Sequence, residues 1–277
     1  MSQEITWGKD RHERAVDRFY GIGVERYGEY HNGYLNFGLW EDGERDYLHA
    51  ADHLVHTLAL PLGLASETRL LDVACGMGTQ DVFLAGTFKT QIDAVDVTWK
   101  HVQRATKRVQ EAGMEERIRV HHGTATELPF SGETFDAVLC VEGAEHIDTR
   151  ERFFQEAFRV LKPGGKIALA DYVLTRWPKC WWQKRLVDIA ARLWRVPRAN
   201  YETAESYQET MHRSGFHVTA SQLVGAKTIP GYFFETRRWE NQKKMFRIRG
   251  VLTTYLGLLG DYSLYLAFKY RLVEYLL

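Results

Sequence analysis

Short apolar runs alternate with helical patterns through the middle of the chain. Runs with the length of buried strands lie at 69–74, 91–97, 118–122, 135–141 and 166–173. Helical periodicity fills the gaps between them at 79–88, 99–112 and 149–161. The Leu-Lys-Pro-Gly-Gly run at 161–165 indicates a helix stop and a turn, because proline cannot continue a helix and glycine supplies a left-handed cap. Strands separated by helices in this way predict a parallel, doubly wound α/β sheet.

The segments on either side of this core differ from it in composition and in their predicted elements. Before it, a helical pattern within 10–30 and another at 44–62 flank a loop of glycine, asparagine and aromatic residues at 31–40. After it come tryptophans among basic residues, a helix near 203–214, a strand-like run at 216–224, and a basic and then apolar tail. We therefore divide the chain into a helical and aromatic N-terminal segment (1–62), an α/β core (63–175), a helical cap insertion (176–202), the end of the core (203–235) and a helical tail (236–277).

Composition and charge exclude several classes of protein. Lysine plus arginine and aspartate plus glutamate both number 36, so the basic excess of a dedicated nucleic-acid binder is missing. Cys75, Cys140 and Cys180 form no Cys-x-x-Cys pair, which argues against a disulfide framework or a zinc site. The first ten residues lack the apolar core of a signal peptide. We expect a cytoplasmic protein that holds no metal.

A glycine turn carries the strongest chemical signal. The first strand ends in Asp72, Gly76 and Gly78 follow, and a helix begins directly after them. A strand, a glycine turn and a helix N-terminus allow a nucleotide-like ligand to lie against bare backbone. Asp81 stands where the dinucleotide fingerprint Gly-x-Gly-x-x-Gly has its third glycine, which weakens an assignment to NAD.

A second carboxylate follows at a spacing that suits a ribose. Asp96 closes the second strand, 18 residues after Gly78, and a carboxylate can accept from two adjacent hydroxyl groups. NAD and S-adenosyl cofactors share this chemistry, so Asp96 does not choose between them. The turn after the third strand, within 123–130, would put backbone and short side chains near an adenine edge.

These motifs, taken in order, resemble the class I S-adenosylmethionine-dependent methyltransferases. The resemblance covers about 65–175 and rests on Asp-Val-Ala-Cys-Gly-Met-Gly-Thr, the Val-Asp-Val-Thr acid, the stretch 123–136 and the stretch 161–171. It implies a Rossmann-like sheet that binds S-adenosylmethionine. The cofactor-binding residues that it implies are Asp72, Ala74, Gly76 and Gly78 at the methionine part, Asp96 and Val97 at the ribose, Thr124 and Ala125 at the adenine, and Glu142.

The adenine position departs from the pattern of the family. Many members carry an aspartate where this chain has Thr124, and that acid accepts from the adenine amino group. The backbone N–H of Ala125 remains as a donor to the adenine.

The flanking segments resemble one group within this family more closely. Residues 136–146 are similar to the Glu-x-x-Glu-His stretch of tocopherol and sterol methyltransferases and their natural-product relatives. The resemblance implies a small lipophilic or aromatic acceptor, methylated on carbon, oxygen or nitrogen, and a role in secondary metabolism. We expect Tyr20, Tyr34, His146 and Trp177 to line the acceptor pocket.

Two residues beyond the fourth strand are candidates for acid–base chemistry. His146 is a plausible base, since an unperturbed histidine has a pKa of about 6.5, and Glu142 is the second candidate. Both follow the carboxyl end of a strand, where open α/β sheets bind ligands. The structural alternative is that His146 packs beneath the cofactor and orients a loop.

The tail allows several interpretations. Its apolar part, 250–268, is 19 residues long, close to the length of a membrane span, but Asp261, three glycines and several hydroxyl residues dilute it. Leu252, Leu256 and Leu259 recur at helical spacing, which favours docking on the cap or on a second subunit in a homodimer. The basic stretch at 236–249 adds peripheral contact with an anionic membrane surface as an alternative.

The sequence therefore leaves three hypotheses about function, each from a different class. Small-molecule methyl transfer rests on the ordered motifs. An NAD(P)-linked oxidoreductase rests on the strand, glycine turn and helix, although the one Tyr-x-x-x-Lys, Tyr265 with Lys269, falls in the tail. A non-catalytic S-adenosyl-binding or membrane-associated protein rests on Thr124 and on the tail. The methyltransferase is the hypothesis that the sequence favours.

Overall fold

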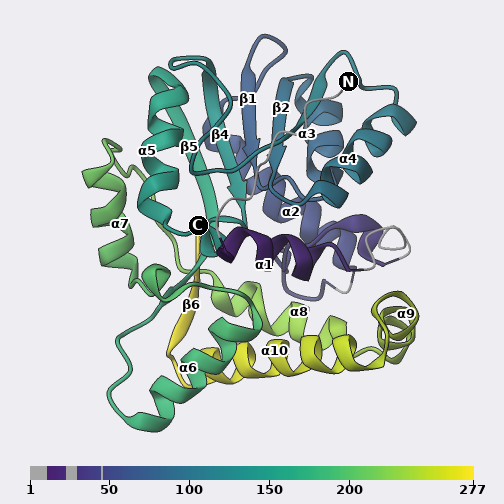
Figure 1. The fold of residues 1–277 in the computed structure, drawn as a ribbon, viewed down its shortest axis with the longest axis vertical. Coiled ribbons are helices and arrows are strands. Elements are labelled where there is room, and N and C mark those ends of the chain that lie inside the picture. The colour runs from purple at the N-terminus through teal and green to yellow at the C-terminus, as the bar shows by residue number, and fades with distance from the viewer. Residues whose placement is uncertain (1–10, 23–29, 45) are drawn as a thin grey trace.

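The protein folds around one six-stranded sheet. The computed structural model describes residues 11–22, 30–44 and 46–277. The strands are β1 (Arg69–Val73), β2 (Gln91–Asp96), β3 (Ile118–His122), β4 (Phe135–Val141), β5 (Leu161–Leu174) and β6 (Val273–Leu276). Their order is β3-β2-β1-β4-β5-β6, with β6 antiparallel to β5 and the other pairs parallel. The predicted doubly wound, Rossmann-like sheet is confirmed (Figure 1).

Ten α-helices lie within the described residues. They are α1 (Arg11–Tyr20), α2 (Tyr47–Ala59), α3 (Thr79–Phe88), α4 (Trp99–Glu111), α5 (Arg150–Val160), α6 (Trp181–Leu193), α7 (Ala204–Arg213), α8 (Ile229–Thr236), α9 (Trp239–Arg249) and α10 (Val251–Lys269). Short 3-10 turns lie at His31–Gly33, Leu60–Leu62, Ala144–His146, Arg198–Asn200 and Gly225–Lys227. The three helices predicted between the strands are present as α3, α4 and α5. Part of the helical pattern expected at 10–30 falls outside the described residues.

Alternating side chains of the strands face two separate cores. Leu70 of β1 and Ala137 of β4 lie in one core, which α2, α3 and α4 cover. Their neighbours Leu71 and Val138 lie in the other core, which α5 and α7 cover. Period-two burial of this kind explains why the strands have apolar residues on both faces.

The C-terminal part of the sheet differs from the prediction in two places. β5 begins at Leu161, where the sequence indicates a turn, and a register shift lies between Phe135 and Ala137 of β4. The strand expected at 216–224 was wrong. That segment forms no named strand, and Gln222 and Val224 donate to the carbonyls of Leu277 and Tyr275, at 2.8 Å in both cases.

The last residues of the expected helical tail are a strand. Val273 and Tyr275 are buried, and β6 pairs with β5 along Asp171–Leu174. The four residues of β6 are too few to show a clear period of two, so the sequence did not separate this strand from the helix before it.

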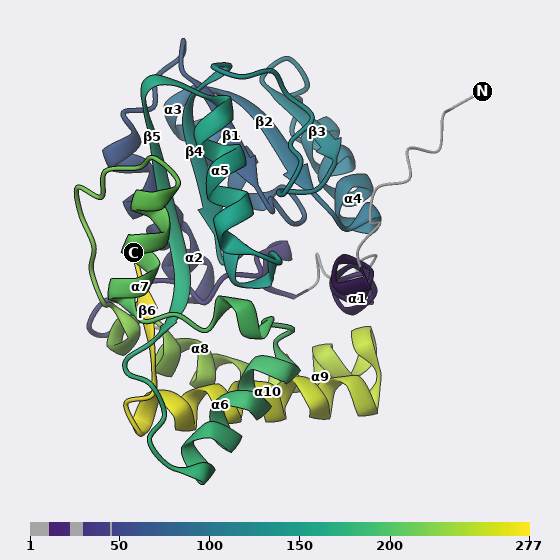
Figure 2. The same cartoon turned by 60° about the vertical axis from the view of Figure 1, so that its left-hand side comes forward.

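A layer of helices closes the sheet at the carboxyl ends of its parallel strands. α10 packs against α6 and α8, and Figures 1 and 2 show this layer below the sheet. α1 crosses between the layer and the sheet (Figures 1 and 2). Along the part of the chain that the structure describes, no helix has both the length and the hydropathy needed to cross a membrane.

A buried arginine ties the loop after β4 to this arrangement. Arg150, only 1% exposed, donates from Nε and Nη2 to the two carboxylate oxygens of Asp171, both at 2.9 Å. Tyr207 donates to the same carboxylate at 3.0 Å. Nη2 of Arg150 also donates to the Tyr172 carbonyl at 2.8 Å, and its Nη1 to the Asn200 carbonyl. The Arg150–Asp171 ion pair is therefore buried, bidentate and hydrogen-bonded to its surroundings. A buried ion pair with this geometry is costly to break.

We expect Arg150→Met to lower the free energy of unfolding by about 3–5 kcal/mol, because it leaves Asp171 buried without its cation. Urea denaturation at neutral pH measures the loss. Arg213→Met is the matched control, since Arg213 and its partner Glu151 are both exposed, and we expect it to change stability by less than about 0.5 kcal/mol. A similar loss in the two variants would contradict the structural role of Arg150.

Candidate active site

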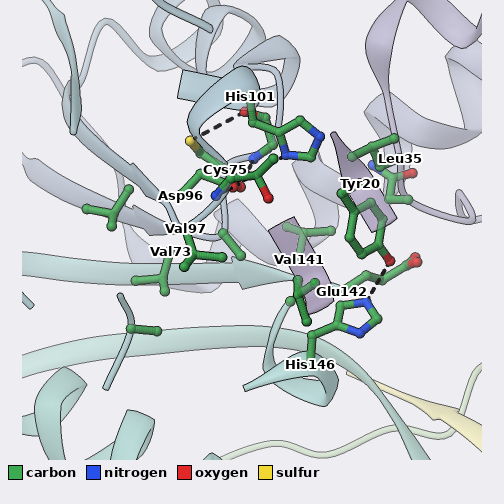
Figure 3. Close-up of a pocket in the computed structure, with 18 of the residues that line it drawn as sticks. Tyr20, Leu35, Val73, Cys75, Asp96, Val97, His101, Val141, Glu142 and His146 are labelled. Atoms are coloured by element: carbon green, nitrogen blue, oxygen red, sulfur yellow. Dashed lines mark hydrogen bonds and ion pairs between the residues drawn. The ribbon is translucent and has the colours of Figure 1, made fainter. Parts of the chain in front are cut away.

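One cavity gathers most of the residues that the motifs predicted. It lies at the carboxyl ends of β1, β2 and β4, the edge at which open α/β sheets bind ligands. It encloses about 1080 Å³ outside protein atoms, with its open mouth included. Ten of the predicted site residues line it: Tyr20, Tyr34, Ala74, Gly76, Asp96, Val97, Thr124, Ala125, Glu142 and His146. Figure 3 shows several of them converging from the sheet and from α1.

Three predicted site residues lie elsewhere. Gly78 does not line the cavity; a Cβ on it would come within 2.9 Å of the Ala105 Cβ, so this glycine allows α4 to pack closely. Asp72 lies beneath the turn and accepts from Gln80 Nε2 at 2.6 Å. Trp177 is 58% exposed and outside the cavity, and Trp194 lines it instead.

Alternate residues of the glycine turn have a left-handed backbone conformation. Ala74, Gly76 and Gly78 have φ values of 61°, 58° and 73°. Gly76 exposes its backbone to the cavity, and its N–H donates to Oδ2 of Asp96 at 2.8 Å. The other oxygen of Asp96 accepts from the Thr98 N–H at 2.7 Å and lies 3.4 Å from His101 Nδ1. The carboxylate thus fixes the turn after β1 relative to the end of β2, and each oxygen still has a lone pair for a ligand.

Two buried carboxyl groups support the turn from below. Asp72 and Asp81 are both 0% exposed, and burial raises the pKa of Asp72 to about 7. Burial and the neighbouring Asp72 also raise the pKa of Asp81 well above its ordinary value. Two carboxyl groups this close favour sharing a proton.

Glu142 is a fixed part of the wall. Its Oε1 accepts from the Phe37 N–H and the Tyr275 hydroxyl, both at 2.6 Å, and Tyr172 donates to Oε2 at 3.3 Å. Burial raises its pKa to about 7, although these three donors act in the opposite direction. Because its oxygens already serve three protein donors, Glu142 is better suited to hold the loop at Phe37 than to move a proton.

His146 and Tyr20 form the reactive pair of the cavity. The Tyr20 hydroxyl lies 2.7 Å from Nε2 of His146 and points at the imidazole (Figure 3). Burial lowers the pKa of His146 to about 4. The imidazole is therefore neutral at pH 7, and its Nε2 can accept the proton of the Tyr20 hydroxyl.

Several residues of the cavity were missed by the sequence analysis. Glu13 of α1 accepts a hydrogen bond from the Thr124 hydroxyl and lines the cavity. Phe37, Tyr172 and Trp194 line it as well. Nothing in their local sequence marks them as functional, because each reaches the site from a segment that is distant along the chain.

The comparisons with known proteins agree with the motifs. Residues 71–169 match the family model of the methyltransferase domain. The chain is 40% identical over 141 residues to erythromycin 3''-O-methyltransferase of Saccharopolyspora erythraea, which covers 50% of this chain but only 46% of that relative. It is 27% identical over 243 residues to 27-O-demethylrifamycin SV methyltransferase of Amycolatopsis mediterranei, covering 87% of this chain and 84% of that one.

Solved structures share the whole fold. The cyclopropane synthase MmaA2 from Mycobacterium tuberculosis has a TM-score of 0.82 at 16% identity, over 97% of this chain and 98% of that chain. The [4+2]-cyclase SpnF has a TM-score of 0.77 at 22% identity, over 95% and 93%. Likeness at this level of identity shows the fold alone, and one fold can host different reactions.

The domain match, the fold and the glycine turn agree with one another. Residues 71–169 carry the domain of the class I S-adenosylmethionine-dependent methyltransferases.

The residues present fit S-adenosylmethionine. Gly76 offers bare backbone, and Asp96 offers a carboxylate for ribose hydroxyls. Near the turn, the buried Asn36 Nδ2 and Glu145 Oε2 have no hydrogen-bond partner among the described residues, and both residues line the cavity. The carboxylate of the methionine part needs a donor, which Asn36 Nδ2 offers, and its ammonium needs an acceptor, which Glu145 Oε2 offers.

We expect Asp96→Asn to weaken the binding of S-adenosylhomocysteine by about 10- to 100-fold, the range for losing hydrogen bonds to a charged group. Isothermal titration calorimetry measures the dissociation constant. Asp93→Asn is the matched control, because Asp93 lies on the same strand, pairs with Arg69 at 2.8 Å and stays outside the cavity. Equal binding by wild type and Asp96→Asn would remove Asp96 from the cofactor site.

Proposed function

We propose that this protein transfers a methyl group from S-adenosylmethionine to a hydroxyl group of a lipophilic small molecule. The observation that carries the proposal is the Tyr20–His146 pair, with its neutral imidazole inside the cofactor cavity. A hydroxyl acceptor needs a base that is unprotonated at neutral pH, and His146 meets that requirement. The names of two relatives support the choice of oxygen: one is an erythromycin 3''-O-methyltransferase, and the other is a 27-O-demethylrifamycin SV methyltransferase.

The chain's residues divide the work of the reaction. When bound, S-adenosylmethionine supplies a methyl group activated by its sulfonium sulfur. Gly76 and Asp96 would hold the cofactor. The Tyr20 hydroxyl, 2.7 Å from Nε2 of His146, would pass its own proton to that nitrogen and take up the proton of the acceptor hydroxyl as the acceptor oxygen gains the methyl group. His146 would thus act as the base through Tyr20. Holding both reactants in line accounts for much of the rate in a transfer of this kind.

A second cavity beside His146 suits a lipophilic acceptor. It shares Glu145, His146, Tyr172 and Trp194 with the first cavity. Its remaining walls come from β5, α6, α10, β6 and the segment after α6. Most of these residues are apolar: Val173, Leu174, Val187, Ala190, Ala191, Val196, Asn200, Tyr201, Leu264 and Val273. An apolar pocket with few polar groups binds an apolar ligand and excludes water from the transfer.

The test is methyl transfer to a panel of hydroxylated macrolides and aromatic polyketides, with a deuterated methyl donor and mass spectrometry of the products. We expect O-methyl products, and His146→Asn to lower kcat by about 10²- to 10⁴-fold. The affinity for S-adenosylhomocysteine should change little, which separates a base from a cofactor ligand.

His121→Asn is the matched control. His121 binds Asp93 at 2.7 Å and lies outside the cavity, so its loss should leave kcat unchanged. Full activity in His146→Asn would overturn the role of the base. Cofactor binding without transfer to any acceptor would favour the non-catalytic alternative, and methylation on carbon or nitrogen would overturn the choice of oxygen.

We also propose that the helical layer contacts an anionic membrane surface. Residues 176–198 hold seven basic and one acidic residue, and 237–271 hold eight basic and two acidic. These two segments therefore carry a formal charge of +12, and the rest of the chain carries −12, because the total is zero. A second copy would bring two such positive layers together, which disfavours the homodimer.

An exposed apolar stripe accompanies this charge. The outward positions of α10 between 251 and 262 are all apolar or aromatic and 46–74% exposed: Val251, Leu252, Tyr255, Leu256, Leu259 and Tyr262. A helix that combines an apolar face with nearby basic residues is suited to lie in the plane of a membrane interface. Such a surface would also hold a lipophilic acceptor near the enzyme.

Flotation with lipid vesicles tests this contact. We expect binding to vesicles of phosphatidylcholine with phosphatidylglycerol, little binding to phosphatidylcholine alone, and weaker binding at high salt. Leu256→Asp should abolish it. Leu60→Asp is the control, since Leu60 is 60% exposed outside the helical layer. Absence of binding to the anionic vesicles, or a dimer in sedimentation that Leu256→Asp dissociates, would overturn the proposal.

A further inference from the structure

The inner face of α1 runs along the cavity. Glu13, Val16 and Tyr20 all line it, and their spacing of three and four residues places them on one side of the helix. The rise of an α-helix separates Glu13 from Tyr20 by about 10 Å along its axis. One helix therefore supplies a carboxylate at one end of the site and the partner of His146 at the other.

Contacts at several points fix the position of α1. His12 Nε2 lies 2.9 Å from the His146 carbonyl, and Arg249 donates to the Phe19 carbonyl at 3.2 Å. The Phe19 ring packs against the guanidinium groups of Arg249 and Arg195, at 5.3 and 5.4 Å. Glu13 is thus held by its helix as well as by the hydroxyl of Thr124.

The order of the strands decides which part of the cofactor Glu13 meets. The glycine turn follows β1, Asp96 ends β2, and the turn at 123–125 follows β3, so these three stand side by side in the sequence β1, β2, β3. Gly123 donates to the Asp96 carbonyl at 3.2 Å, which keeps the last two in contact. With the methionine part at β1 and the ribose at β2, the nucleobase falls at β3, beside Glu13.

We propose that Glu13 accepts the hydrogen bond of the exocyclic amino group of the cofactor's adenine. The edge of adenine presents this amino donor beside a ring nitrogen that accepts. A carboxylate from Glu13 next to the backbone N–H of Ala125 provides the complementary pair. The Thr124 hydroxyl, which donates to Glu13, orients the carboxylate. The inference rests on the proposed use of S-adenosylmethionine and adds the residue that recognises its base.

Two ligands that differ only at this edge test the proposal. S-inosylhomocysteine has a carbonyl oxygen in place of the amino group of S-adenosylhomocysteine, and a carboxylate repels that oxygen. We expect wild type to prefer S-adenosylhomocysteine by about 10- to 100-fold in calorimetric titration, the range for a hydrogen bond to a charged group.

Substitutions at Glu13 should remove this preference in distinct ways. Glu13→Ala should weaken the binding of S-adenosylhomocysteine, which loses a hydrogen bond, and should tighten that of S-inosylhomocysteine, which loses a repulsion. Glu13→Gln should tighten S-inosylhomocysteine, because an amide N–H can donate to its carbonyl. Adding Thr124→Asp to Glu13→Ala should restore the preference, since it returns a carboxylate to the same end of the cavity.

Asp17→Ala is the matched control, an acid of the same helix that does not line the cavity, and it should leave the preference unchanged. A melting temperature for each variant shows that it is folded. Equal weakening of both ligands in Glu13→Ala, or an unchanged preference, would overturn the role of Glu13. Failure of wild type to bind S-adenosylhomocysteine would instead overturn the proposed function.

Discussion

The hydrogen bond between the Gly76 N–H and the Asp96 carboxylate organises the site. It joins the turn after β1 to the end of β2 and holds the backbone of that turn toward the cavity. The turn can stay in its left-handed conformation because the same carboxylate also accepts from Thr98, and because Asp72 and Asp81 fill the space below. Charged oxygens in a buried position are costly unless they are hydrogen-bonded, so the buried Asp96 carboxylate and the turn that donates to it depend on each other.

The sequence predicted the parts of the molecule that are local. Asp96 ends a strand, and Gly76 and Thr124 each follow one within three residues, so a strand pattern with a polar end was enough to bring them to one edge. Glu13 and Trp194 could not be found in this way. They reach the cavity because α1 and the residue after α6 pack there, and such packing depends on tertiary contacts far apart in the sequence. Trp177 was predicted for the pocket from the same tryptophan-rich stretch as Trp194, but it is exposed. The sequence pattern alone did not show which tryptophan packs against the site.

Glu142 was a candidate base by its position in the sequence, but its hydrogen bonds favour a structural role. It is a carboxylate at the end of β4, in the position where a base would be sought, but two tyrosines and one backbone N–H occupy its oxygens. His146, four residues later, has a neutral ring and a single close hydroxyl partner. The two were equivalent candidates by position, and only their hydrogen bonds separate them.

Strand β6 links the last residues of the chain to the loop that precedes the sheet. Tyr275 of β6 and the backbone N–H of Phe37 both donate to Oε1 of Glu142. Residues separated by more than two hundred positions thus meet at one carboxylate. During synthesis, the chain therefore cannot complete the hydrogen bonds of this carboxylate until its last strand has been made.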